Sequence, residues 1–141
     1  MVLAARSLDK LQDLAQELSP LCQVYYAAMD VSSADSVASF FAELPEQFQQ
    51  IDVLVNSAGL ALGVEPAYEA DFANWETMID TNITGLLRVT RAVLPSMVER
   101  DTGHIINIGS TAGNWPYPGG NTYGASKAFV QNFSRALRAD L

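Results

Sequence analysis

The sequence contains little cysteine and little histidine, and each shortage excludes a kind of site. Its 141 residues include one cysteine, Cys22, so no internal disulfide can form. Cys22 lies in an apolar run, where we expect a buried and unreactive thiol. The only histidine is His104, at the start of an expected strand. Since no cluster of cysteine and histidine exists, we predict no metal site.

Positive charge is also scarce. Eight Lys and Arg residues face 16 Asp and Glu residues, which gives a formal net charge of -8. Such a surface repels phosphate backbones and anionic lipids, so we expect no nucleic-acid partner and no membrane partner. No apolar run approaches the roughly 18 residues of a membrane span, and the first six residues are too short for a signal peptide. These shortages favour a soluble cytoplasmic protein.

The residues that are abundant indicate a folded domain. Hydrophobic residues make up 49% of the chain and charged residues 17%, which is typical of a globular protein. Apolar runs and helical periodicity alternate four times along the chain. The expected strands are 2–5, 22–29, 51–55 and 104–108, and the expected helices are 8–18, 33–45, 74–100 and 122–141. This alternation predicts an α/β fold with a doubly wound parallel sheet, whose strands are covered by helices on both faces.

Several polar residues fall at one edge of this expected sheet. Asp30, Asn56 and Ser110 each follow an expected strand, where open parallel sheets bind their ligands. The helix of Tyr123 and Lys127 begins just after the Ser110 loop. Tyr123 and Lys127 are four residues apart, so they share a helix face, and a positive charge beside a phenol favours the phenolate. Each residue alone also fits an ordinary structural role, but their convergence indicates a site for proton transfer.

These motifs also carry a family resemblance. The run Asn56-Ser57-Ala58-Gly59, then Asn82, Ser110 and Tyr123-x-x-x-Lys127 occur in an order and spacing that resemble the short-chain dehydrogenases/reductases. The resemblance covers essentially the whole chain and implies a single-domain Rossmann-type fold. It also implies a general acid/base at Tyr123, a Lys127 that assists it and binds the nicotinamide ribose, a Ser110 that holds the substrate oxygen, and an Asn82 that holds a water in a proton relay.

The residues after the first expected strand indicate the cofactor. The strand 2–5 ends in Arg6 with no acidic residue at its tip. An acidic residue there binds the ribose of NAD, whereas an Arg accommodates the 2′-phosphate of NADP. We therefore expect NADP. The resemblance further places Asp30 and Val31 against the adenine, and it places the cofactor ribose beside three residues of the next loop, Asn56, Ala58 and Gly59.

Two positions depart from the family pattern. Ser57 stands where the family often has Asn, which is expected to alter a local hydrogen bond. Ser7 stands where related NADP enzymes carry a second basic residue, which is expected to weaken the phosphate contact.

Three longer stretches, 63–66, 75–82 and 109–117, are similar to one branch of the family. That branch comprises NADP-dependent 3-hydroxy acid dehydrogenases that oxidise serine and related hydroxy acids. The resemblance implies an NADP-dependent oxidoreductase that interconverts a hydroxyl and a carbonyl on a small substrate, with a 3-hydroxy acid such as serine as the expected one. It also implies a homo-oligomer, a dimer or a tetramer.

The family's first strand and its Gly-rich phosphate turn have no counterpart in the sequence, and neither do the family's last strands. We therefore expect residues 1–141 to be a partial Rossmann domain, truncated at both ends. The strands 2–5 and 51–55 would each lose a neighbour. Either they close up on each other, or another chain fills the gap, or the piece is only partly folded.

Two further classes of function stay open at this stage. The first is a non-catalytic remnant of the family, acting as an interaction or dimerisation module without a cofactor. The second is a flavodoxin-like binding domain, which fits the fold but leaves Asn82, Ser110, Tyr123 and Lys127 without a role.

Overall fold

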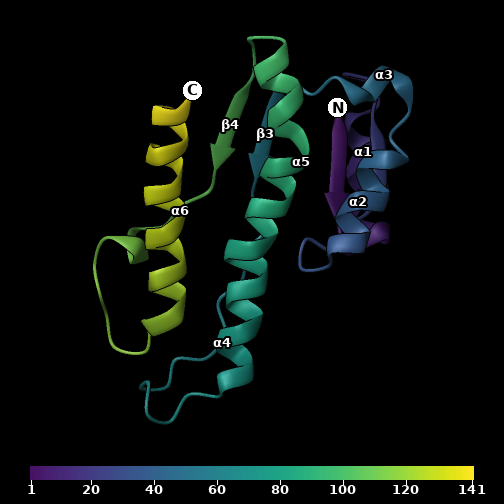
Figure 1. The fold of residues 1–141 in the computed structure, drawn as a ribbon. Helices are drawn as coiled ribbons and strands as arrows, with labels where there is room; N and C mark the ends of the chain where they lie inside the picture. The colour runs from purple at the N-terminus through teal and green to yellow at the C-terminus, as the bar shows by residue number, and fades with distance from the viewer.

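The computed structural model describes residues 1–141 and has an α/β architecture (Figure 1). The strands are β1 Val2–Ala5, β2 Tyr25–Ala28, β3 Val53–Asn56 and β4 His104–Asn107. The helices are α1 Leu8–Leu18, α2 Ala34–Ala42, α3 Glu46–Gln49, α4 Phe72–Ile79, α5 Leu86–Glu99 and α6 Asn121–Asp140. A π-helical turn, η1 Asp80–Gly85, joins α4 to α5, and a 3₁₀ turn, η2 Thr111–Gly113, precedes α6. The predicted order of strands and helices is confirmed.

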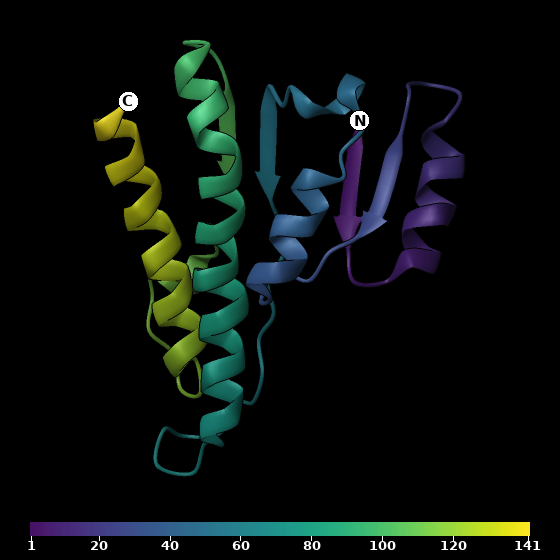
Figure 2. The same ribbon diagram turned by 45° about the vertical axis from the view of Figure 1, so that its right-hand side comes forward.

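The four strands form two separate parallel pairs rather than one sheet. β1 pairs with β2 and β3 pairs with β4, with Val2 opposite Tyr25 and Val53 opposite His104. Figure 2 shows β1 and β3 as separate strands that run in the same direction. The two strands therefore do not close up on each other, which excludes the first of the three alternatives that the sequence left open for them.

The division leaves one backbone edge of β1 and one of β3 unpaired. The Tyr25 N–H donates to the Met1 carbonyl at 2.9 Å, and the His104 N–H donates to the Asp52 carbonyl at 2.9 Å. A parallel strand bonds each neighbour through alternate residues. The backbone groups directed to the free edges are therefore those of Val2, Ala4, Val53 and Val55.

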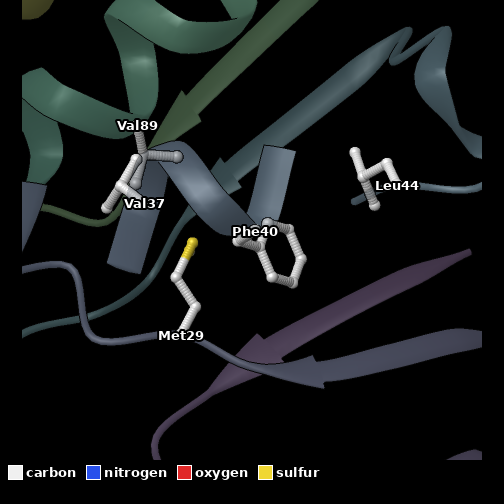
Figure 3. Close-up of a cluster of buried hydrophobic side chains, with 5 residues drawn as sticks. All are labelled: Met29, Val37, Phe40, Leu44 and Val89. Carbon is white, nitrogen blue, oxygen red and sulfur yellow. The ribbon is translucent and has the colours of Figure 1, made fainter. Parts of the chain in front are cut away.

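A hydrophobic cluster connects the two strand pairs. It consists of the buried side chains Met29, Val37, Phe40, Leu44 and Val89, which come from the end of β2, from α2 and the segment after it, and from α5 (Figure 3). Val2 of β1 and Leu54 of β3 both pack against this cluster. The core therefore bridges the strand pairs even though their backbones do not meet.

The opposite face of the β3–β4 pair is exposed. Val53 and Val55 are 55% and 51% exposed, and Ile106 is 39% exposed. The prediction that all strands are covered on both faces is therefore wrong for this pair, because helices cover only the face that carries Leu54 and Ile105.

The long predicted helix 74–100 is present, but it is interrupted. It starts at Phe72, where the Asp71 carboxylate accepts the N–H of Ala73 at 3.0 Å, and it passes Pro95 inside α5. The π-helical turn η1 in its middle was not predicted. Such turns insert one extra residue into a helix and often lie at functional sites.

Cys22 is half-buried in the segment between α1 and β2, so the expectation of a buried thiol is wrong.

None of the helices combines the length and the apolar composition needed to cross a membrane.

Candidate active site

Tyr123 and Lys127 lie in the first turns of α6. Lys127 is 8% exposed, and its ammonium lies 5.9 Å from the centre of the Tyr123 ring. The Lys127 Nζ donates to the Ile108 carbonyl at 2.9 Å, and no carboxylate pairs with it, since the one ion pair of the molecule joins Arg100 to Asp52. An ammonium has three donors, so this largely buried charge retains two for a ligand. A buried charge without a counter-ion is costly.

Ser110 is held against the same helix. Its carbonyl accepts a hydrogen bond from the Gln131 side chain at 3.0 Å, and its hydroxyl accepts the N–H of Ala112 at 3.1 Å. The 3₁₀ turn after it touches the backbone of α6, because a Cβ on Gly113 would lie 2.7 Å from the carbonyl carbon of Lys127. This close approach places the Ser110 loop beside the Tyr123–Lys127 turn.

The side chain of Asn82 is fully engaged by the protein. It projects from the π-helical turn and is 2% exposed. Its Nδ2 donates to the Leu60 carbonyl at 2.9 Å and to the Ser126 Oγ at 3.0 Å, while its Oδ1 accepts the Leu60 N–H at 2.9 Å. Ser126 in turn donates to the Tyr123 carbonyl at 2.7 Å. A water bound to the Asn82 side chain would therefore have to donate to its Oδ1, since both amide hydrogens are already donated.

Gly59 brings the loop after β3 to the same place. A Cβ at Gly59 would lie 3.4 Å from the Asn82 Oδ1 and 3.4 Å from the Lys127 Nζ. The glycine thus forms a wall beside the free donors of Lys127, and the preceding Ala58 is exposed.

Asn56 is also directed into the protein. Its Nδ2 donates to the Thr90 hydroxyl on α5 at 3.0 Å and to the Asn107 Oδ1 on β4 at 2.9 Å. A cofactor could contact Asn56 only through its backbone or its side-chain oxygen, because both amide hydrogens are donated to Thr90 and Asn107.

A second group of predicted residues lies at the carboxyl ends of β1 and β2. The Ser32 hydroxyl and N–H donate to the Asp30 carboxylate at 2.7 and 2.9 Å. These hydrogen bonds, that of the hydroxyl first, hold the pKa of Asp30 below its usual range, and the Arg6 charge lowers it further. Arg6 itself is exposed and free of ion pairs. Val31 packs against Gly85 of the π-helical turn, where a Cβ would lie 2.6 Å from the Val31 Cγ2.

The structure thus places the predicted residues in two groups, both at the carboxyl ends of the strands. Sequence reasoning missed the residues that hold these groups in place. Ser126 had a readable signal, because a helical Ser often hydrogen-bonds the carbonyl three or four residues earlier. Its other partner, Asn82, is 44 residues away and has no such signal. No local sequence pattern indicated Arg88 either. Arg88 donates to the Ser32 carbonyl at 2.8 Å and so fixes the loop after β2.

Comparison with known proteins gives close relatives. A protein of Shigella flexneri named NADP-dependent 3-hydroxy acid dehydrogenase is 55% identical over 141 residues, which is 100% of this chain and 56% of that protein. A protein of Chromohalobacter salexigens named sulfoacetaldehyde reductase 2 is 52% identical over 142 aligned positions, again 100% of this chain and 56% of the relative. The chain therefore spans little more than half the length of the curated relatives it matches.

A solved structure agrees with these relatives. The closed form of serine dehydrogenase complexed with NADP+ has a TM-score of 0.95 and 56% sequence identity, over 99% of this chain and 56% of that one. The family model described as short chain dehydrogenase matches residues 1–141, the whole of the sequence. The chain therefore belongs to the short-chain dehydrogenase family.

Proposed function

We propose that the protein is an NADP-dependent oxidoreductase that interconverts a hydroxyl and a carbonyl on a small substrate, with a 3-hydroxy acid such as serine as the first candidate. The observation that carries the proposal is the buried Lys127 ammonium, which has two unused donors and lies beside Tyr123. The names of the relatives from Shigella flexneri and Chromohalobacter salexigens support a small polar substrate.

In this proposal each residue has one task. Tyr123 donates a proton to the carbonyl oxygen in reduction and accepts it from the hydroxyl in oxidation. Lys127 stabilises the negative charge on the Tyr123 oxygen, and its free N–H donors suit ribose hydroxyls. Ser110 holds the substrate oxygen. Asn82 holds a relay water through an oxygen, because both of its amide hydrogens are donated inside the protein. A bound nicotinamide cofactor supplies or receives the hydride.

The residues present fit such a cofactor at both ends. Gly59 has no side chain to fill the space beside the Lys127 Nζ, so a ribose and nicotinamide can approach there, along Ala58 and the Asn56 backbone. At the other end, the exposed Arg6 guanidinium has no partner in the protein and suits a 2′-phosphate. Asp30 and Val31 lie at the same end as Arg6, where the adenine would lie. We further propose a homo-oligomer, a dimer or a tetramer, for the active protein.

The proposal is tested by fluorescence titration of the chain with NADPH, followed by turnover of serine with NADP. We expect saturable binding by the wild-type chain. Lys127→Ala should weaken binding roughly tenfold, which is about 1.4 kcal/mol. Tyr123→Phe should bind NADPH normally and lose turnover at least about a hundredfold.

Lys10→Ala is the matched control, because Lys10 is an exposed lysine on α1, far along the chain from α6. It should leave both binding and turnover unchanged. A folded wild-type chain that shows no saturable NADPH binding would overturn the proposal and favour the non-catalytic alternative.

A further inference from the structure

One buried hydroxyl ties the start of α6 to two other segments. Ser126 is 1% exposed, accepts a hydrogen bond from the Asn82 Nδ2 at 3.0 Å and donates one to the Tyr123 carbonyl at 2.7 Å. Asn82 is bonded to both backbone groups of Leu60. The three residues Asn82, Ser126 and Leu60, here called the Asn82 clamp, thus join the π-helical turn, α6 and the loop after β3.

The Asn82 clamp leaves no polar group of these side chains without a partner. Both amide hydrogens of Asn82 are donated, and the hydroxyl of Ser126 both accepts and donates. Removing one member of a saturated buried network strands the polar group of another, and that group has no access to water. The Asn82 clamp therefore has one favourable arrangement, and the helix turn that carries Tyr123 is part of it.

The Asn82 clamp lies beside Gly59, at the border of the candidate site. The Asn82 Oδ1 and the Lys127 Nζ both border the same point, the place where a Cβ of Gly59 would lie. The backbone of Tyr123 is held by Ser126 directly. We therefore expect a change at Ser126 to shift the Tyr123 phenol and the Lys127 ammonium relative to Gly59 without removing either group.

We propose that Ser126 is a positioning residue, which sets the placement of Tyr123 and Lys127 against the loop after β3. The expected effect of Ser126 on turnover rests on the proposed function. The linkage of the three segments is independent of that function, since it follows from the hydrogen bonds of the chain itself.

The chain offers a matched control on the same helix. Ser134 repeats the pattern two turns later: its hydroxyl donates to the Val130 carbonyl at 2.7 Å and accepts from the Asn107 Nδ2 at 2.8 Å. Its partner Asn107 lies on β4 and also accepts a hydrogen bond from Asn56 at the end of β3. Neither Ser134 nor Asn107 hydrogen-bonds Tyr123, Lys127 or residues 57–62. Ser134→Ala therefore removes the same chemical group from the same helix, at a half-buried position.

The experiment compares Ser126→Ala with Ser134→Ala in the 141-residue chain. We expect both variants to lower the midpoint of urea unfolding. Only Ser126→Ala should lower kcat, roughly ten- to hundredfold with KM within about twofold, because a misplaced acid/base slows chemistry more than binding. Ser126→Cys, which keeps a weak donor of similar size, should have an intermediate kcat and serves where the alanine variant does not fold.

Amide hydrogen exchange without any cofactor separates this inference from the proposed function. Ser126→Ala should speed exchange at the Leu60 amide, which Asn82 holds, at least about tenfold more than Ser134→Ala does. If the wild type lacks turnover but this difference appears, the proposed function fails and the linkage stands. Equal effects of the two alanine variants on both exchange and kcat would overturn the positioning role.

Discussion

At the scale of single residues, chemically similar side chains receive different roles from their surroundings. Asn56 and Asn82 both follow from the sequence as site candidates, yet both use their amide donors inside the protein. Lys127 differs, because its ammonium is buried with a single acceptor. Unused donors, rather than residue type, mark the group that is free to bind a ligand.

Asp30 gives a prediction at this scale. Its pKa is held below the ordinary value of 3.8, first by the Ser32 hydroxyl and then by the Ser32 N–H. Because the folded-state pKa is depressed, the ionised carboxylate stabilises the fold fully above the unfolded pKa, which is the ordinary value. This contribution is lost as the pH falls through the folded value. Asp30→Asn should therefore be less stable than the wild type at about pH 7, with a difference that shrinks below about pH 4.

Urea unfolding at several pH values checks this expectation. Ser32→Ala should reduce the stability that the Asp30 carboxylate contributes at neutral pH, because it removes the hydrogen bond that lowers the Asp30 pKa most. Parallel pH profiles for the wild type and Asp30→Asn would show that the Asp30 carboxylate does not contribute.

At the scale of elements, close backbone contact sets the position of the site. The turn η2 approaches α6 so closely that a Cβ on Gly113 would lie 2.7 Å from the Lys127 carbonyl carbon and 2.8 Å from the Ala128 nitrogen. These neighbours are backbone atoms of a helix and cannot move aside cheaply. Gly113→Ala should therefore destabilise the fold by about 1–3 kcal/mol and displace the Ser110 loop.

Gly109→Ala is the control for this contact. A Cβ at Gly109 would meet its nearest atom at 3.9 Å, an ordinary contact, and neither glycine has a positive φ. The control should change the free energy of unfolding by less than about 0.5 kcal/mol, measured by urea unfolding for both variants. Equal stabilities would contradict the close packing of η2 on α6.

At the scale of the whole molecule, the two strand pairs are joined by side chains and not by backbone. Val2 of β1 and Leu54 of β3 share the cluster around Phe40 and Val89, but the facing strand edges have no partner. An unpaired strand edge is also a site where chains associate. The fold therefore combines a continuous core with an interrupted hydrogen-bond network.

Amide exchange measured by NMR in dilute solution tests this arrangement. The free-edge amides should exchange quickly, and these are Val2, Ala4, Val53 and Val55. The amides of Met29 and Ile108, which donate to the Ala5 and Asn56 carbonyls at 3.0 Å, should be protected. Strong protection at Val53 and Val55 in dilute chain would contradict a free edge, and protection that grows with chain concentration would indicate pairing between copies.

The local elements could be read from the sequence because they depend on neighbouring residues. Apolar runs predict the strands, and the periodicity of the leucines at positions 8, 11, 14 and 18 predicts α1. The Tyr-x-x-x-Lys spacing places two residues on one helix face whatever the rest of the chain does. The order of the motifs was likewise sufficient for the family.

The tertiary structure alone decided the features that join distant segments. That β1 and β3 stay apart while Val2 and Leu54 pack against one shared cluster is decided by tertiary packing. Whether Asn82 faces a ligand or the protein depends on Leu60 and Ser126, which are 22 and 44 residues away. The sequence by itself determined which elements form and which polar residues share an edge, because those depend on spacing. Three-dimensional packing decided which of those residues keep free donors, because a hydrogen bond between distant residues is set by how their elements pack and not by spacing.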